Sequence, residues 1–240
     1  MTKQKVILYD DNCPLCCWYT GAFVKTGLLP PDGRQSFSAL DPAQLHTQLD
    51  IDRSKDEIPL LDTAGGETIY GVDSLLYILG QRWPWMVKVA NWPPMNWLIR
   101  RFYKFVSYNR RVIVASQTPA GAFDCSPQFN YFYRYLYLAF ALLLGSLGAW
   151  AFLRAQALPD DYMLALLPVL LGLVAPIIGL PNHAARLRYL GIMLTPYLLM
   201  GLLLLLFLWV PFPAFVAAII LMISGRMWLR RWGVAIDKLM

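Results

Sequence analysis

The chain has 240 residues, of which 58% are hydrophobic and 15% are charged, and its formal net charge is +6. A soluble globular domain usually carries about 25% charged residues, so this composition excludes a disordered chain and a wholly soluble one. The positive excess is modest and no known nucleic-acid recognition motif accompanies it, so we expect no nucleic-acid partner.

The charges are unevenly distributed along the chain. Residues 1–73 carry 11 acidic and 6 basic side chains, residues 74–123 carry 7 basic and no acidic ones, and residues 124–240 carry 8 basic and 4 acidic ones. The sequence therefore predicts an acidic head, a basic neck and a nearly uncharged tail. We place a thioredoxin-like redox domain at 1–82, a basic aromatic helical neck at the membrane interface at 83–130, and a transmembrane domain at 131–240.

The head is expected to be an α/β domain. Strand character at Lys5–Tyr9 is followed by a turn and by an apolar-periodic stretch from Pro14, a residue suited to the first turn of a helix, that ends near Gly27. The remaining pattern predicts a strand at 34–40, a short helix at 41–49, a hairpin of 58–62 and 68–70, and a helix at 72–79. This is the element order of a thioredoxin or glutaredoxin fold. In that fold a cis-proline begins the third strand and faces the active-site cysteines, and Pro59 stands at that point.

Three of the four cysteines, Cys13, Cys16 and Cys17, lie where the first strand meets the first helix. Cys13 is expected at the helix N-cap, where free backbone N–H groups and the helix dipole stabilise a thiolate. Cys16 lies one turn along and can close a disulfide with Cys13. The pattern predicts a redox-active pair in which Cys13 is the nucleophile and Cys16 the resolving thiol.

Other uses of these side chains stay open at this point. Zinc usually takes four ligands and the sequence has only two histidines, so we assign no metal and no cofactor, although two thiols could hold Cu(I). We expect Cys17 to pack inward. We expect Cys125 to be an inert thiol, with a meeting of Cys125 and Cys13 as the alternative. Asp10 is either a turn residue or a group that tunes the pKa of Cys13 or relays a proton, since an acid beside a thiolate raises its pKa.

The neck is aromatic as well as basic. Helical spacing from Trp97 gathers Arg100, Arg101 and Lys104, with Phe102 on a more apolar side. A helix of this kind lies in the lipid headgroup region or packs onto the head domain, and the sequence permits both.

The tail contains uncharged runs long enough for membrane-spanning helices, which need about 20 apolar residues. We predict an all-α transmembrane domain of four helices, with spans near 133–153, 162–181, 189–209 and 212–229. Lys and Arg gather in the neck, between the second and third spans and at the C-terminus, which by the positive-inside rule makes both chain ends cytoplasmic. Residues 1–9 hold too short an apolar stretch for a secretory signal. We expect an integral membrane protein of a bacterial inner membrane, with the lipid bilayer as a partner.

One segment resembles the signature of a known family. The run Tyr9-Asp10-Asp11-Asn12-Cys13-Pro14-Leu15-Cys16 is similar to the D-G-x-C-x-x-C signature of the DCC-type thiol-disulfide oxidoreductases, which are named for their Asp and two Cys. Gly71-Val72-Asp73-Ser74 and Tyr108-Asn109-Arg110-Arg111 look like the family's later glycine-containing and N-R-Y-R-like segments. The resemblance covers about residues 5–115 and implies a redox role for Cys13 and Cys16 and a motif role for Asp10. Asp11 stands where glycine is usual, and Cys17 is additional.

The segment 71–74 is also similar to the glutathione-binding edge of glutaredoxins, where an Asp-Ser-like pair at a helix N-terminus meets a carboxylate. This similarity makes Asp73 and Ser74, with Pro59, candidate substrate-binding residues. It implies protein or small-molecule thiols and disulfides, glutathione among them, as partners. The leading hypothesis is a membrane-anchored thiol-disulfide oxidoreductase. The alternative is a non-catalytic membrane assembly factor or a thiol- or metal-binding factor.

Overall fold

The computed structural model describes residues 5–40, 49–116, 118–119, 124–156, 177, 179–208 and 213–236. Its contacts divide the chain into two compact units, Met1–Phe129 and Asn130–Met240. The division of the first part into a head and a neck at residue 82 stays a prediction.

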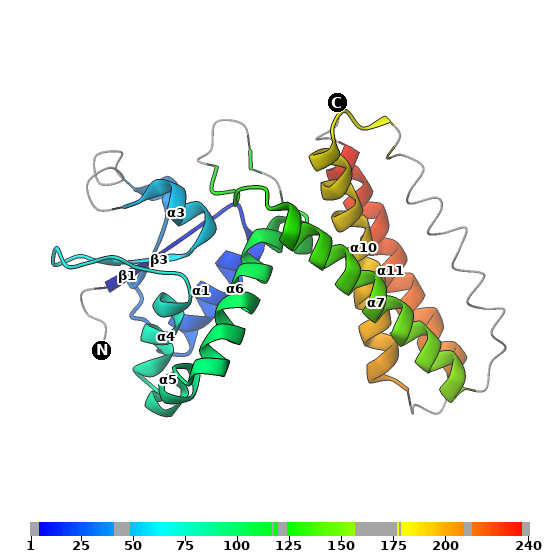
Figure 1. Cartoon of the computed structure of the whole chain (residues 1–240), viewed down its shortest axis with the longest axis horizontal. Helices are drawn as coiled ribbons and strands as arrows, with labels where there is room; N and C mark the ends of the chain where they lie inside the picture. Colours follow the sequence, from blue (N-terminus) through cyan, green and yellow to red (C-terminus); the bar gives the residue numbers. More distant parts are fainter. Residues whose placement is uncertain are drawn as a thin grey trace. The chain divides into compact units, whose positions relative to one another are not determined.

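The first unit contains a mixed four-stranded sheet with the order β2-β1-β3-β4 (Figure 1). β1 (Lys5–Tyr9) runs parallel to β2 (Arg34–Ser36) and antiparallel to β3 (Pro59–Asp62), and β3 pairs antiparallel with β4 (Ile69–Tyr70). Helix α1 (Pro14–Lys25) joins β1 to β2, since parallel neighbours need a crossover connection. Strand, helix, strand, hairpin and helix follow one another in the predicted order.

Three details differ from the sequence-based expectation. β2 ends at Ser36 and gives way to a 3-10 turn, η1 (Phe37–Ala39). A short helix that the apolar pattern does not predict, α3 (Ile51–Asp56), begins after Asp50, whose side chain accepts a hydrogen bond from the Arg53 N–H at 3.0 Å. No peptide bond among the described residues is cis, so Pro59 lacks the cis bond that the thioredoxin fold has at this point. The predicted helix at 41–49 lies, apart from its last residue, outside the described residues.

The sheet has an apolar core on each face because successive residues of a strand point to opposite sides. Ile7 of β1 packs with Leu60 of β3 and Ile78, and with side chains of α1 such as Phe23. Its neighbour Leu8 packs in a second cluster, which contains Phe37, Leu40, Leu49 and Cys125. The strand that leads to the cysteine pair is therefore held on both faces.

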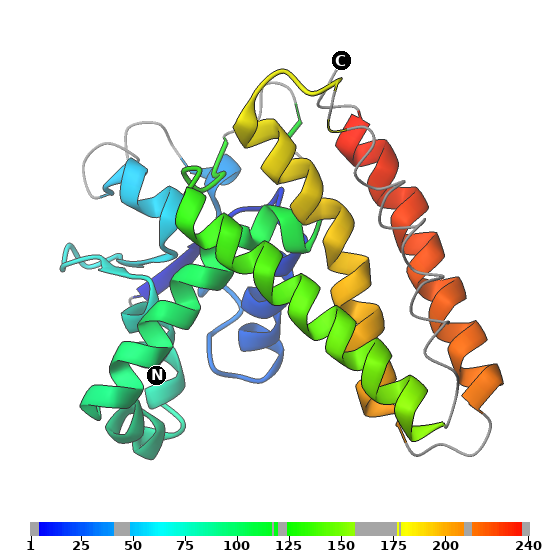
Figure 2. The same ribbon diagram turned by 45° about the vertical axis from the view of Figure 1, so that its right-hand side comes forward.

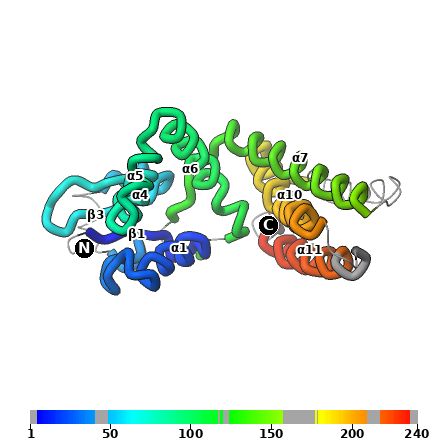
Figure 3. The backbone as a smooth tube through the Cα atoms, turned by 90° about the horizontal axis from the view of Figure 1, so that it is seen from below, coloured from blue at the N-terminus to red at the C-terminus, as the bar shows by residue number. Residues whose placement is uncertain are grey.

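Helices α4 (Val72–Gly80), α5 (Pro84–Ala90) and α6 (Pro93–Ile113) follow the hairpin and lie side by side (Figure 3). α4 begins after Gly71, which has a φ of +67° and donates its N–H to the Ile58 carbonyl at 2.9 Å. That left-handed backbone suits glycine. The C-terminal half of α6 is buried through Ser107, Asn109 and Val112, whereas its N-terminal half exposes Trp97 and Phe102. Packing onto the head is thus observed for one half of the neck helix.

The second unit contains α7 (Tyr131–Ala155), α10 (His183–Leu206) and α11 (Pro213–Ile236), and α10 packs between the other two (Figure 2). α7 and α10 approach closely where Gly148 meets Gly201, because a Cβ at residue 148 would meet the backbone carbonyl of residue 201. The pair is also joined by a hydrogen bond between the Tyr137 and Thr195 hydroxyl groups at 2.7 Å.

Two described helices, not four, are long and apolar enough to cross a membrane. They are α7 and α10, each with a mean hydropathy of 2.0 over its most apolar window, and they correspond to the first and third predicted spans. The second predicted span lies largely outside the described residues, and the fourth falls on α11, which is not one of the two. α7 keeps large apolar side chains such as Leu143 and Phe132 exposed, as a lipid-facing helix would.

Leu60→Ala should weaken the sheet, because the fully buried Leu60 of β3 packs beside its register partner Ile7 of β1 and its removal leaves a cavity. We expect the free energy of opening of the β1 and β3 amides, measured by hydrogen exchange on the full chain, to fall by about 2–5 kcal/mol. Leu98→Ala, at an exposed position of α6, is the control and should change it by less than about 0.5 kcal/mol. Equal effects of the two substitutions would contradict the assigned core.

Candidate functional site

The cysteine pair lies where β1 ends and α1 begins. Cys13 is the N-cap residue of α1, with extended backbone angles (φ −109°, ψ 104°), and Pro14 occupies the first helical turn. The Cys13 carbonyl accepts the Cys17 N–H at 3.0 Å, and the Cys13 N–H donates to the Asp10 carbonyl at 3.1 Å. The N-cap position of Cys13 agrees with the sequence-based expectation, and it puts the sulfur at the positive end of the helix dipole.

The two thiols are free, buried and coupled to each other. Cys13 is 0% exposed and Cys16 is 3% exposed. A hydrogen bond from the Cys16 side chain lowers the pKa of Cys13 to about 6, although burial acts in the opposite direction. The same hydrogen bond and burial raise the pKa of Cys16. The pair therefore holds one proton and one negative charge near neutral pH, with the charge on Cys13 and the proton on Cys16.

Arg110 of α6 supplies positive charge to this buried site. Its guanidinium donates to the Lys55 carbonyl at 2.8 Å and to the Cys125 carbonyl, and its side chain is buried. The positive charge of Arg110 further lowers the pKa of Cys13. A cation in a poorly solvated site stabilises a neighbouring thiolate more strongly than it would in water.

Asp10 is buried and paired with the next arginine of α6. Its carboxylate accepts from the Arg111 guanidinium at 2.7 Å and from the Asn12 N–H at 3.0 Å, while Arg111 also donates to the Asn12 carbonyl at 3.1 Å. Burial raises the pKa of Asp10, whereas Arg111 acts to lower it. Asp10 raises the pKa of Cys13, and so opposes the contribution of Arg110. The arrangement fits the tuning role considered for Asp10.

The remaining cysteines have different surroundings. Cys17 is half-buried and its thiol donates to the Asp11 carbonyl at 3.5 Å, so the expected inward packing is only partial. Cys125 is buried in the core cluster with Leu8, and burial raises its pKa to about 12. A thiol that stays protonated agrees with the inert role expected for Cys125.

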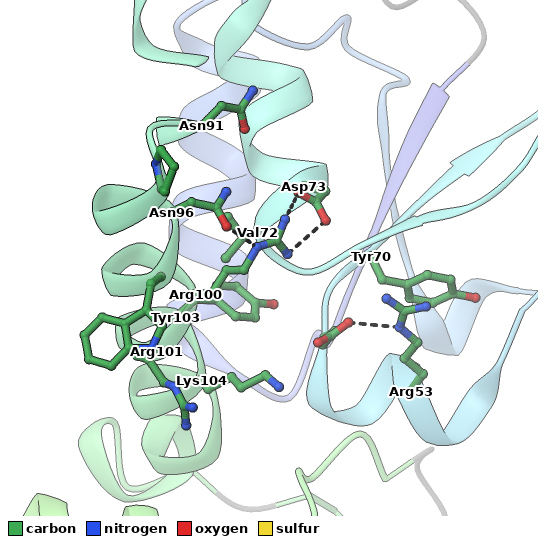
Figure 4. A pocket seen from close by; sticks show the side chains of 13 residues that line it. Arg53, Tyr70, Val72, Asp73, Asn91, Asn96, Arg100, Arg101, Tyr103 and Lys104 are labelled. Carbon is green, nitrogen blue, oxygen red and sulfur yellow. Dashed lines mark hydrogen bonds and ion pairs between the residues drawn. The ribbon is translucent and has the colours of Figure 1, made fainter. Parts of the chain in front are cut away.

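The predicted substrate-binding residues do not form one group. Pro59 is fully buried at the start of β3 and lines a small void of about 10 Å³ together with Asp10, Cys16 and Arg110. Ser74 is also fully buried, and its hydroxyl donates to the carbonyls of Ile58 and Ile69 at 3.0 and 2.8 Å. Asp73 forms an ion pair with Arg100 at 2.7 Å in a separate polar cavity (Figure 4).

An apolar groove of about 550 Å³ reaches the cysteine pair from the helical side. Its walls come from α1, α4, α5 and α6, and they include Cys16, Trp18, Leu76, Met86, Phe102 and Arg110. Cys13 does not line it. The groove gives an apolar ligand or peptide segment a surface next to Cys16.

Arg110 and Arg111 are the site residues that the sequence analysis did not predict. They lie about 100 residues from the cysteines, within a basic segment whose charge was attributed to the membrane interface. The available signal was the resemblance of residues 108–111 to the N-R-Y-R-like segment, which includes both arginines. Asp11 does not adopt the left-handed backbone conformation that favours glycine, because Ala115 is the only described non-glycine residue with a positive φ.

Within the described ranges, no group of three or more His, Cys, Asp or Glu side chains could hold a metal ion.

Comparison with known proteins gives one family match, within the first unit. Residues 7–116 match the family of DCC1-like thiol-disulfide oxidoreductases. No curated protein and no solved structure gives a significant match.

The reactivity of Cys13 should follow its lowered pKa. Because the thiolate is the nucleophile, the rate of Cys13 alkylation by iodoacetamide should rise with pH through a midpoint near 6. Cys16→Ala removes the hydrogen bond to the thiolate, so the midpoint should move to higher pH. Mass spectrometry of the labelled Cys13 peptide gives both profiles. An unchanged midpoint in the variant would refute the coupling between the two sulfurs.

Arg110→Gln should also raise the pKa of Cys13, because it removes a buried positive charge close to the thiolate. We expect the alkylation midpoint of Cys13 to move to higher pH. Arg101→Gln removes the same charge from an exposed position of α6 and is the matched control. Its midpoint should stay at the wild-type value, and equal shifts in the two variants would argue against a specific role for Arg110.

Proposed function

We propose that the chain is a membrane-anchored enzyme that exchanges disulfides through Cys13 and Cys16, because residues 7–116 match the DCC1-like thiol-disulfide oxidoreductase family. The observation that carries the proposal is the asymmetry of the pair. One sulfur has a pKa lowered to about 6, and the other is held protonated beside it. A nucleophile and a resolving thiol require this division of roles.

The architecture supports a thioredoxin-like assignment for the first unit. A strand leads into the cysteine-bearing helix, a parallel strand follows, and an antiparallel hairpin begins at Pro59 beside Cys16. The trans bond at Pro59 is a departure from the usual thioredoxin pattern.

We propose the following exchange. The Cys13 thiolate attacks one sulfur of a substrate disulfide, which forms a mixed disulfide and releases the other sulfur as a thiolate that takes up a proton. Cys16 then loses its proton and attacks the Cys13 sulfur, which closes the Cys13–Cys16 disulfide and releases the second substrate thiol. The substrate disulfide gains two electrons from the pair and two protons, one from the Cys16 thiol and one from the solvent. The reverse sequence oxidises a substrate dithiol.

Substrate access follows from the burial of the pair. Because Cys13 is fully buried, attack on a substrate requires a local movement that uncovers its sulfur. The apolar groove beside Cys16 favours substrates with an apolar segment next to the disulfide. Glutathione recognition through Asp73 and Ser74 has less support, since the Ser74 hydroxyl is buried and already bonded to two carbonyls.

Anchoring in the membrane is supported by α7 and α10, which have the length and composition of spanning helices. A bacterial inner membrane with a cytoplasmic head and C-terminus remains our proposal for the location, and it rests on the distribution of Lys and Arg.

Trapping experiments test the two cysteine roles. In Cys16→Ser the mixed disulfide cannot be resolved, so disulfide-linked adducts of the chain should accumulate on a non-reducing gel and disappear with dithiothreitol. In Cys13→Ser the nucleophile is missing, so adducts should be absent. Equal trapping by the two variants would contradict the assignment.

A redox titration separates the proposal from the non-catalytic alternative. Equilibration with glutathione buffers and thiol alkylation should give a two-electron transition of the Cys13–Cys16 pair. If both thiols stayed free over the whole range, a thiol- or metal-binding role without turnover would replace the proposal.

A further inference from the structure

A polar cavity of about 600 Å³ lies between α3, the start of α4 and α6, and neither cysteine of the pair nor Asp10 lines it. This volume falls in the range of small-molecule binding sites. Four cationic side chains line the cavity: Arg53, Arg100, Arg101 and Lys104 (Figure 4).

The two acidic side chains of the cavity are already engaged. Glu57 pairs with Arg53 at 2.9 Å, and Asp73 pairs with Arg100 through two contacts at 2.7 and 3.1 Å. Arg101 and Lys104 have no ion pair among the described residues. The cavity therefore carries two surplus positive charges, which an anionic ligand would neutralise.

The cavity also offers uncharged donors and an aromatic edge. The side chains of Asn91 and Asn96 line it. The Arg101 guanidinium carbon lies 5.8 Å from the centroid of the Trp97 ring. In Figure 4 the Lys104 side chain extends from α6 toward the side that carries Arg53 and Tyr70. Guanidinium and ammonium groups around one space are the usual ligands of a phosphate group.

The surface around the cavity indicates which phosphate compound binds. Trp97, which lines the cavity, is 61% exposed, and Trp92 at the N-cap of α6 is also exposed. Tryptophan beside Lys and Arg is typical of the membrane–water interface. In the sequence, only 17 residues (114–130) separate α6 from the apolar helix α7. A soluble phosphate compound would interact with the basic side chains but would leave the exposed aromatic surface beside the cavity uncovered.

We propose that the cavity binds the phosphate headgroup of an anionic membrane phospholipid. Arg101 and Lys104 contact the phosphate, and the exposed aromatic residues of α6 lie in the interfacial layer around it. This inference does not depend on thiol exchange, so a Cys13→Ser chain should bind the lipid as wild type does.

The location of the site can be tested by amine footprinting of the full chain in a neutral detergent. Dihexanoyl phosphatidylglycerol should slow acylation of Lys104, while Lys25 on α1 reports non-specific effects. Dihexanoyl phosphatidylcholine and inorganic phosphate at the same concentration should protect Lys104 much less. Equal protection by phosphatidylcholine would show that the positive charges do not select the ligand. Equal protection by inorganic phosphate would show a site for free phosphate. Either result overturns the proposal.

The affinity can be tested by isothermal titration of dihexanoyl phosphatidylglycerol into variants of equal net charge. Arg101→Gln with Lys104→Gln should weaken binding by about 10- to 30-fold, at about 1 kcal/mol for each basic residue near a lipid phosphate. Arg82→Gln with Lys88→Gln removes two exposed charges outside the cavity and should change binding by less than about threefold. Equal losses in the two double variants would mean diffuse electrostatic attraction and would refute a defined site.

Discussion

The first unit is organised around a guanidinium that is buried against backbone carbonyls. A buried cation is costly unless it is compensated, and the Arg110 Nη2 donates to the carbonyls of Lys55 and Cys125, whereas its buried Nε has no hydrogen-bond partner among the described residues. These contacts join the end of α6 to the end of α3 and to the segment that follows α6. They also bring a positive charge to the buried sulfurs of Cys13 and Cys16. One residue thus connects the packing of the unit with the chemistry of its thiols.

The cysteine pair shows how burial separates two chemically identical groups. A poorly solvated site accommodates one negative charge more readily than two, so the sulfur that receives the hydrogen bond and the helix dipole holds the charge. A stabilised thiolate favours the reduced form of the pair, and this makes its disulfide a better oxidant. Asp10 acts against that trend, because its charge raises the pKa of Cys13. Arg111 limits the effect by pairing with Asp10 at 2.7 Å. The Cys16 hydrogen bond and burial have the largest effects on the pKa of Cys13, and the charges of Arg110 and Asp10 add smaller, opposite contributions.

Helix α6 combines two roles that its composition alone does not separate. Its C-terminal half is buried and supplies the arginines of the redox site, whereas its N-terminal half exposes Trp97 and lines the polar cavity. The sequence left packing onto the head and contact with lipid headgroups as alternatives for this helix. The structure shows the first for residues near Arg110. The second remains a proposal for the basic face around Lys104.

The sequence by itself determined the features that depend on neighbouring residues. The order of strands and helices in the first unit, the start of α1 at Pro14 and the N-cap position of Cys13 follow from local patterns of apolar, proline and turn residues. The sequence analysis missed the helix after Asp50, which has little local signal. It also predicted four membrane spans from the number of apolar runs, whereas two described helices have the required length and composition. Only the tertiary structure decided that Arg110 lies beside the cysteines and that the Ser74 hydroxyl is consumed by carbonyls. These contacts join residues far apart in the chain, and their geometry depends on how the helices pack on the sheet.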